Sequence, residues 1–153
     1  MTQIKADQLT EVVLNVFRLN GALTEWGDRF VLPDGLTSTR WRMLGAVALV
    51  KRPLTAPQIA LMMGVTRQGA QKQLNLLVDS GLMATQGNPL HKRSPLYALT
   101  ANGQSIYNTV NARWQQQANH MAAGFSTAEL AAAVHVLNGL IETHEKSLSE
   151  SHL

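Results

Sequence analysis

The residues best suited to binding chemistry lie between Gly64 and Gly81, in the stretch GVTRQGAQKQLNLLVDSG. Its polar side chains are amides and cations, and no carboxylate occurs before Asp79. Amides and guanidinium groups suit the edges of DNA bases, because Gln can pair bidentately with adenine and Arg with guanine. A Lys, or a hydroxyl at a helix N-terminus, suits phosphate. The candidate DNA-binding residues of this stretch are Thr66, Arg67, Gln68, Gln71, Lys72 and Asn75.

The same stretch has the pattern of an amphipathic helix. At about 100° per residue the polar residues from Arg67 to Asn75 share one arc of about 140°. Ala70, Leu74 and Leu77 fall on the opposite side and are predicted to face the core. The alternative is an ordinary helix with an amide-rich solvent face. The missing acids, and a second basic element nearby, favour a surface that meets a polyanion.

That second element is the triplet His91-Lys92-Arg93. It lies in the segment GNPLHKRS, between two predicted strands, Leu82–Gln86 and Pro95–Leu99. A basic hairpin that follows two helices is typical of a wing, which lies along phosphates or reaches the minor groove. The alternative is a solvated turn.

The remaining elements read as helices with recognisable ends. A short helix, Ala56–Met63, begins with a capping box formed by Thr55 and Gln58. Gly64 separates it from the helix capped by Thr66, so the pair predicts a helix-turn-helix. Before this pair we expect a helix over 3–29, a turn at Pro33-Asp34-Gly35 and a helix over 38–50. After the wing we expect a long helix from Thr100 to about Ala123. A second capping box, Ser126 and Glu129 with Phe125 and Leu130 as its hydrophobic staple, begins a last helix that runs to about Lys146 before a frayed tail, SLSESHL.

Composition and charge point the same way. The chain has 153 residues, a size that fits one domain, and only 15% of them are charged, which favours a large buried subunit interface. The segment from Arg40 to Thr100 carries eight Lys or Arg residues and a single acid, whereas the rest carries five cations and nine acids. A basic middle between acidic ends is typical of a protein that binds nucleic acid.

Several function classes are excluded. There is no cysteine, so disulfides, cysteine-ligated zinc and thiol redox sensing are ruled out. The N-terminus lacks a secretory pattern, and the longest apolar run, Met43–Val50, is too short for a membrane span, so we expect a cytoplasmic protein. The five histidines lack metal-ligand spacing, and no nucleophile elbow or phosphate loop occurs. We therefore expect that the protein is not an enzyme and that it binds neither a metal ion nor a cofactor.

The order of elements resembles the MarR family of winged helix-turn-helix transcription regulators. Five short motifs carry the resemblance. The first is Leu36-Thr37 with Arg40-Trp41 and Leu44, which resembles LT-x-x-Q-W-x-x-L, and the second is Ala56–Met63, which resembles the first helix of the helix-turn-helix. The others are Gly64–Arg67, which resembles G-V-S-R, Leu77 to Leu82, which matches L-x-x-x-G-L, and Leu99 to Gly103, which matches L-T-x-x-G. The wing departs from the family pattern D-x-R, in which the Asp braces the Arg. Here His91 takes the place of the Asp, and Pro95 removes a backbone donor from the returning strand.

The resemblance implies a mainly α fold with a small β-wing, a winged helix-turn-helix with N- and C-terminal dimerisation helices. It divides the single domain 1–153 into a DNA-binding lobe, 36–100, and dimerisation helices, 1–30 and 101–147. It also implies a homodimer with recognition helices in successive major grooves. Independently, the wide apolar stripes of 3–29 and 126–141 exceed what one small winged helix can cover.

The resemblance further implies a small aromatic or phenolic effector. Candidate ligand-binding residues are Trp26, Trp41, Met43 and Trp114, all of which also suit a core. The leading hypothesis is a homodimeric, sequence-specific repressor that binds double-stranded DNA at a pseudo-palindromic operator and responds to a ligand. The alternatives are a winged-helix protein-interaction module and a non-specific architectural DNA-binding protein.

Overall fold

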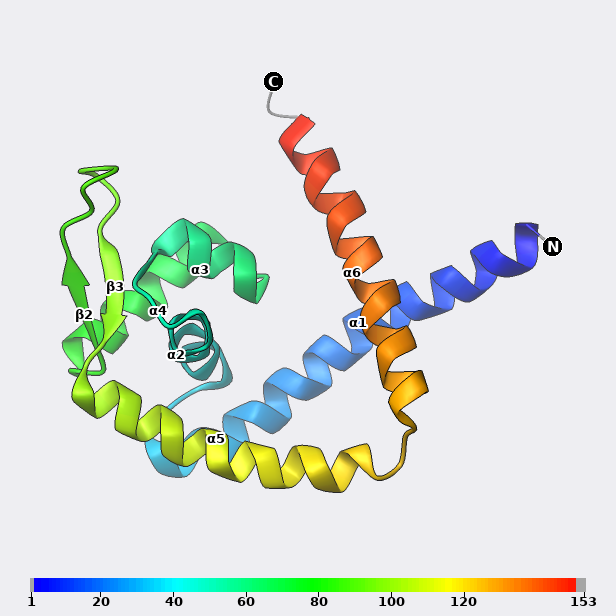
Figure 1. Ribbon diagram of the computed structural model, residues 1–153, viewed down its shortest axis with the longest axis horizontal. Helices are drawn as coiled ribbons and strands as arrows, with labels where there is room; N and C mark the ends of the chain where they lie inside the picture. The colour runs from blue at the N-terminus through cyan, green and yellow to red at the C-terminus, as the bar shows by residue number, and fades with distance from the viewer. Residues whose placement is uncertain (1, 151–153) are drawn as a thin grey trace. The chain divides into compact units, whose positions relative to one another are not determined.

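The computed structural model describes residues 2–150, with side chains as far as Leu148. Figure 1 shows a mainly helical chain with one small sheet. The elements in order are α1 (Thr2–Val31), the 3-10 turn η1 (Leu32–Asp34), α2 (Ser38–Val50), β1 (Leu54–Thr55), α3 (Ala56–Met63), α4 (Arg67–Asp79), β2 (Met83–Gln86), β3 (Leu96–Leu99), α5 (Ala101–Ala122) and α6 (Thr127–Glu150). The chain divides into two compact units between Asn111 and Ala112. The predicted fold class is confirmed.

The end of α1 is fixed to the start of α2. The backbone N–H of Ser38 donates to the Asp28 carboxylate at 2.7 Å, so Asp28 satisfies one of the free amides of the α2 N-terminus. Gly27 allows the close approach, because a Cβ there would lie 2.9 Å from the Ser38 hydroxyl oxygen. The turn between the helices ends at Gly35, whose φ of 72° favours glycine.

The two short helices of the first unit have the caps that the sequence predicts. Thr55 accepts from the backbone N–H of Gln58, and the Gln58 side chain accepts from the N–H of Thr55, which completes the capping box. Thr66 accepts from the N–H of Gly69 at 2.9 Å and caps α4. Gly64, with φ 64°, turns the chain between α3 and α4.

One core holds these helices together. It is formed by apolar side chains from α2, α3, α4 and the sheet, and its fully buried members include Met43, Leu44, Leu54, Ile59, Leu74, Leu77 and Met83. Tyr107 on α5 joins the same core, and burial raises the pKa of its hydroxyl above the ordinary value of 10.0.

The sheet is antiparallel with the strand order β1-β3-β2. The predicted hairpin is confirmed as β2 and β3, with Thr85 paired to Tyr97. The sequence analysis missed β1, in which Leu54 pairs with Tyr97 from the other side. Two residues carry no readable alternation, and only the neighbouring β3 makes them a strand. Tyr97 therefore lies on the central strand.

The start of α5 is anchored to the turn before β2. Thr100 accepts from the N–H of Gly103 at 3.0 Å and its hydroxyl donates to the Gly81 carbonyl oxygen at 2.6 Å. The first turn of α5 crosses the Leu82 backbone so closely that a Cβ at Gly103 would collide with the Leu82 carbonyl oxygen. This contact gives a physical reason for the glycine in the sequence Leu-Thr-Ala-x-Gly.

In the second unit, α6 begins where predicted but ends later. Ser126 accepts from the N–H of Glu129 at 3.1 Å, as its capping role requires. The expectation that the last helix ends near Lys146 and that the tail is frayed is wrong for 147–150, because α6 continues to Glu150. Its i, i+4 ion pair, Glu142 with Lys146, supports helix near that end. The rest of the expected tail, 151–153, lies outside the described residues.

Within residues 2–150 no single helix is long and apolar enough to cross a membrane. Of the helices in this range, only α5 and α6 taken together reach that length and apolar composition, and the two helices are bent by 111° at the break between them.

Candidate nucleic-acid interface

The polar face of α4 is exposed, as predicted. Arg67, Gln68, Gln71, Lys72 and Asn75 are all exposed, and α4 carries no acid before Asp79, its last residue, which is exposed at the C-terminal end of the same face. On the opposite side, three apolar residues anchor the helix and are fully buried: Ala70, Leu74 and Leu77. The anchor packs against α2 and α3, so the backbone of α4 is held firmly while its polar side chains point outward.

The N-terminus of α4 is built around Thr66. Its hydroxyl oxygen accepts from Gly69, and a Cβ at Gly69 would lie 2.9 Å from that same oxygen. Glycine at this position therefore leaves room for the Thr66 cap. Thr66 is exposed, and the amides of the first turn lie beside it, an arrangement that suits a phosphate group.

The amide of Gln71 is already engaged inside the protein. Its Nε2 donates to the Asn75 Oδ1 at 2.9 Å and to the Tyr97 hydroxyl oxygen at 2.7 Å. The sequence analysis missed Tyr97, because alternation along β3 indicates a buried residue but not the hydrogen bond that its hydroxyl makes. Bidentate pairing of Gln with adenine needs a free N–H, so this geometry differs from the simple readout expected for Gln71.

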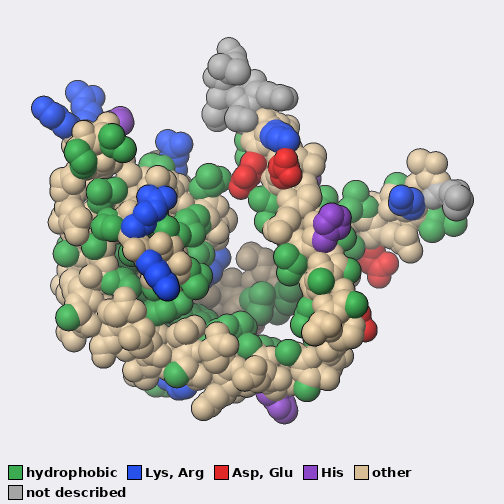
Figure 2. All heavy atoms as spheres, in the orientation of Figure 1, with side chains coloured by type: hydrophobic (Ala, Val, Ile, Leu, Met, Phe, Trp, Pro, Cys, Tyr) green, Lys and Arg blue, Asp and Glu red, His purple; other side chains and the backbone are tan. Residues whose placement is uncertain are grey.

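The predicted wing is the hairpin of β2 and β3. His91, Lys92 and Arg93 are exposed at its tip, where Figure 2 shows Lys, Arg and His side chains gathered at one end of the hairpin. Among the described residues, the Arg93 side chain makes no hydrogen bond or salt bridge inside the protein. The missing family carboxylate is thus not replaced at Arg93.

Asn88 organises the wing loop instead. Its Nδ2 donates to the Ser94 carbonyl oxygen at 2.9 Å, and its Oδ1 accepts from the N–H of Leu90 at 3.0 Å. The N–H of His91 donates to the Asn88 carbonyl oxygen at 3.2 Å. Asn88 therefore ties the two ends of the loop together and holds the basic tip in one conformation.

Not every cation of the basic segment belongs to this surface. Arg42 turns toward the helix-turn-helix, where its Nη1 donates to the Met63 carbonyl oxygen at 3.2 Å. Arg40 is half-buried and its Nε donates to the Thr37 hydroxyl oxygen. Lys72 and Lys92, by contrast, are exposed and form no salt bridge among residues 2–150. The wing and α4 supply accessible charge, and Lys51 and Arg52, between α2 and β1, are exposed as well.

Two of the candidate ligand residues in the first unit, Trp26 and Trp41, belong to one aromatic cluster. Trp26 stacks on Phe30 with ring centroids 4.7 Å apart, and Phe30 contacts Trp41 at 5.6 Å. Met43 is fully buried in the core. Trp114 lies in the second compact unit. Trp26 and Trp41 therefore share one aromatic cluster, and Met43 lies away from solvent.

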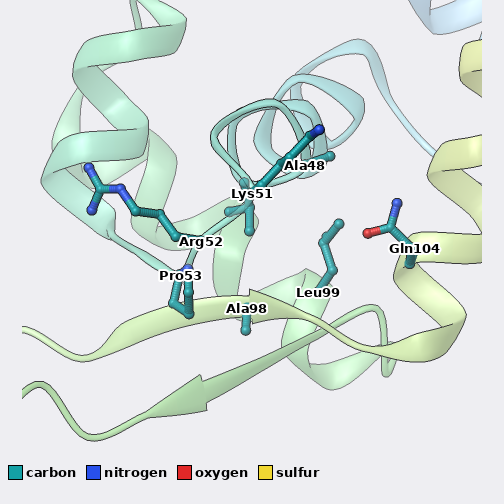
Figure 3. A pocket seen from close by; sticks show the side chains of 8 residues that line it. Ala48, Lys51, Arg52, Pro53, Ala98, Leu99 and Gln104 are labelled. Atoms are coloured by element: carbon teal, nitrogen blue, oxygen red, sulfur yellow. The ribbon is translucent and has the colours of Figure 1, made fainter.

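Cavities elsewhere in the first unit include one between α2 and β3 and one beside α3. The larger holds about 450 Å³, and Figure 3 shows Arg52 and Pro53 on one side of it and Leu99 and Gln104 on the other. The smaller holds about 330 Å³ beside α3 and includes Arg67 in its lining. Neither is lined by a predicted ligand residue. The described residues also contain no group of three or more His, Asp or Glu side chains that could share a metal ion.

Comparison with known proteins agrees with this geometry. A family model described as MarR family matches residues 34–94. An uncharacterized protein of Mycobacterium tuberculosis (strain ATCC 25618 / H37Rv) is 37% identical over 136 residues, which are 89% of this chain and 94% of that protein. An uncharacterized protein of Mycobacterium bovis matches to the same extent.

Solved structures are similar over nearly the whole chain. The crystal structure of a MarR family transcription regulator is 28% identical, covers 97% of each chain and has a TM-score of 0.75. CouR from Rhodococcus jostii RHA1, bound to p-coumaroyl-CoA, is 17% identical, covers 87% of this chain and 94% of its own, and has a TM-score of 0.75. The second likeness concerns the fold alone. Sequence and fold together place the chain in the MarR family: it is a winged helix-turn-helix transcription regulator, which implies DNA binding, and not an enzyme.

Proposed function

We propose that the chain is a repressor that binds a pseudo-palindromic operator as a homodimer and releases it when a small aromatic ligand binds. The observation that carries the proposal is the exposed face of α4, which has amides and cations and no acid before Asp79 at its C-terminal end, on a buried apolar anchor. An exposed helix that meets only water ordinarily mixes both signs of charge. A face of this composition is suited to a duplex, whose backbone is anionic and whose base edges accept and donate hydrogen bonds.

The contacts divide into two kinds. Arg67, Gln68, Gln71 and Asn75 reach base edges in the major groove, and Lys72 and the Thr66 cap hold phosphate. The wing tip, His91 to Arg93, contacts the phosphate backbone of the DNA next to the bases that α4 reads. Its exposed cations support this role. This division predicts that α4 sets sequence preference while the wing sets affinity.

The homodimer accounts for apolar side chains that each unit leaves exposed. On α1 they include Ile4, Leu14 and Phe17, and on α6 they include Val134 and Ile141. A soluble regulator rarely leaves such a series open to water. Two copies that pair through these helices would present two α4 helices to half-sites about 10 base pairs apart.

An effector completes the proposal. The aromatic cluster of Trp26, Phe30 and Trp41 offers flat apolar surface, and Trp26 is partly exposed. CouR shares the fold and is bound to p-coumaroyl-CoA, which supports an aromatic ligand as the first to try. Trp114 and Met43 stay predictions as further ligand contacts.

The test is a selection of genomic fragments by the purified protein, followed by sequencing and footprinting. We expect one pseudo-palindromic motif, affinity that falls steeply with salt, and weak competition by random DNA. Equal competition by random DNA would instead indicate an architectural protein, and no salt-dependent DNA binding would indicate an interaction module. The variant Gln71→Ala should lose about 1–3 kcal/mol of discrimination at one base pair.

Two further arms address regulation. Transcription from the selected operator in vitro should fall when the protein is added, and a rise would make the protein an activator. Aromatic acids and p-coumaroyl-CoA, added to the same assay, should restore transcription and change tryptophan fluorescence. The variant Trp26→Phe should weaken that response while leaving operator binding intact.

A further inference from the structure

Two polar residues of α4 form one unit with a tyrosine of the sheet. Gln71 lies between Asn75, one turn further along α4, and Tyr97 on β3. The two hydrogens of its Nε2 are directed to the Asn75 Oδ1 and to the Tyr97 hydroxyl oxygen, at 2.9 and 2.7 Å. An amide nitrogen carries only two hydrogens, so the donor capacity of Gln71 is used up inside the protein.

Tyr97 is a rigid point of attachment. It is only 3% exposed and lies on the central strand, paired to Leu54 on one side and to Thr85 on the other. Its ring packs in the core, so the hydroxyl reaches the helix face from a fixed position. The Gln71 and Asn75 side chains are exposed, and amides on a helix surface ordinarily rotate freely. Here the buried hydroxyl selects one orientation for both.

The orientation decides which atoms are left for a partner. Among the described residues, the Gln71 Oε1 accepts no hydrogen bond and the Asn75 Nδ2 donates none. Gln71 therefore presents an acceptor, which suits the amino group of cytosine or of adenine. Asn75 presents a donor, which suits N7 or O6 of guanine, N7 of adenine or O4 of thymine.

We propose that Tyr97 is a specificity-determining positioning residue, which makes Gln71 an acceptor and Asn75 a donor toward the base edges of the operator. The proposal rests on the proposed function, since it assumes that α4 enters the major groove. It corrects the simple expectation that Gln71 pairs bidentately with adenine, because such a pair needs an N–H toward N7 that Tyr97 and Asn75 already hold.

The decisive experiment measures affinity for every single-base variant of the selected operator. The proteins are the wild type, Tyr97→Phe, Gln71→Ala and the double variant, with Tyr107→Phe as the matched control because Tyr107 is a second largely buried tyrosine of the same unit. In Tyr97→Phe one N–H of Gln71 becomes free, so adenine should gain about fivefold or more over cytosine at the base pair that Gln71 reads. Base pairs that neither Gln71 nor Asn75 reads should keep their preferences.

The double variant separates positioning from a general effect on folding. If Tyr97 acts through Gln71, adding Tyr97→Phe to Gln71→Ala changes no base preference further. A base profile of Tyr97→Phe that equals the wild type, or additive effects in the double variant, would overturn the proposal. Asn75→Ala removes the other internal acceptor from an exposed position, so it should also raise the preference for adenine and serves if Tyr97→Phe folds poorly.

A measurement without DNA keeps this inference apart from the proposed function. In NMR spectra of the free protein, the Gln71 side-chain amide should exchange with solvent at least several-fold more slowly than that of exposed Gln68. Tyr97→Phe should abolish the difference. Equal exchange rates of the two amides in the wild type would overturn the hydrogen bonding of Gln71 to Tyr97 and Asn75. If the Gln71 amide exchanges slowly but Gln71→Ala changes no base preference, the base-reading role in the proposed function fails instead.

Discussion

Arg42 illustrates, at the scale of one residue, how charge in a sequence differs from charge on a surface. It belongs to the basic segment, yet its Nη1 donates to the carbonyl oxygen of Met63, the last residue of α3. Its Nε is buried and has no hydrogen-bond partner among the described atoms. The side chain thus links α2 to the turn of the helix-turn-helix, where its charge strengthens a structural hydrogen bond.

The comparison of Arg42→Ala with Lys72→Ala tests this assignment. Arg42→Ala should lower the free energy of unfolding by about 1–3 kcal/mol, because a carbonyl group loses a charged donor. It should leave the salt dependence of DNA binding unchanged. Lys72→Ala should do the reverse, with stability within about 0.5 kcal/mol of wild type and a salt slope lower by about one unit. Urea unfolding and binding titrations at several salt concentrations measure both. A lower slope for Arg42→Ala would place its guanidinium on the DNA.

The junction of α5 with the wing shows how two elements depend on one missing side chain. The Thr100 N–H donates to the Leu82 carbonyl oxygen at 3.2 Å, and the first turn of α5 passes directly over that carbonyl group at Gly103. A methyl group at Gly103 would force the helix away from the strand. Because the contact is with backbone, no side-chain rotation can relieve it.

Gly103→Ala should therefore lower the free energy of unfolding by about 1–3 kcal/mol, the range for overpacking in a closely packed region. Gly87→Ala is the matched control, since a Cβ there meets nothing within 4 Å and its backbone needs no left-handed conformation. Its stability should stay within about 0.5 kcal/mol of wild type. Thermal or urea unfolding decides, and equal effects of the two substitutions would refute the close approach.

The wing permits a second test at the scale of elements. Lys92→Ala should weaken binding to all duplexes alike and lower the salt slope by about one unit, because one phosphate contact is lost. Asn88→Ala should weaken binding without changing the slope, because it loosens the loop and removes no charge. Affinities for operator and random DNA between low and physiological salt separate the two. An unchanged slope for Lys92→Ala would exclude the wing from the contact set.

The elements that the sequence predicts well are those with local signals. Thr55 and Thr66 indicate where helices begin, because each caps its helix through a short-range hydrogen bond. Gly64 and Gly81 indicate turns, because each adopts a left-handed backbone conformation. The two-residue strand β1 has no such signal, because it exists only through its pairing with β3.

In the candidate site, too, features with a local signal could be predicted from the sequence, and contacts between distant residues could not. Periodicity alone places the exposed and buried faces of α4, and the structure confirms them. The bond from Gln71 to Tyr97 spans 26 positions of sequence, and the Arg42 bond to Met63 spans 21. Such pairs arise only when the fold brings separate elements together, α4 with β3 in the first case and α2 with α3 in the second, so no local pattern indicates them. The direction in which each amide points is likewise a property of the folded lobe.

At the scale of the whole molecule, the distribution of apolar side chains bears on how the protein binds DNA. Exposed large apolar residues recur along α1, from Ile4 to Trp26, and along α6, whereas in residues 36–100 a buried core accompanies a few exposed ones such as Leu49 and Leu90. If the protein binds a pseudo-palindromic operator as we propose, each half-site offers contacts to a single α4, so tight binding depends on two copies that act together. Dimerisation and operator affinity should accordingly fail together when the exposed apolar face of α1 is disrupted.

Phe17→Lys tests that link, with Leu49→Lys as its matched control. The two side chains are exposed to nearly the same extent, 72% and 69%, and both substitutions place the same cation on a helix surface. If the α1 face pairs with a second copy, burying a Lys there is costly, so Phe17→Lys should shift the protein to monomer in light scattering or sedimentation. Operator affinity should then fall at least tenfold even though the variant carries an extra positive charge, and Leu49→Lys should remain dimeric with nearly unchanged affinity. Since added charge alone strengthens DNA binding, weaker binding by the monomeric variant can only come from the loss of the second half-site. A dimeric Phe17→Lys protein would show that α1 is covered in some other way.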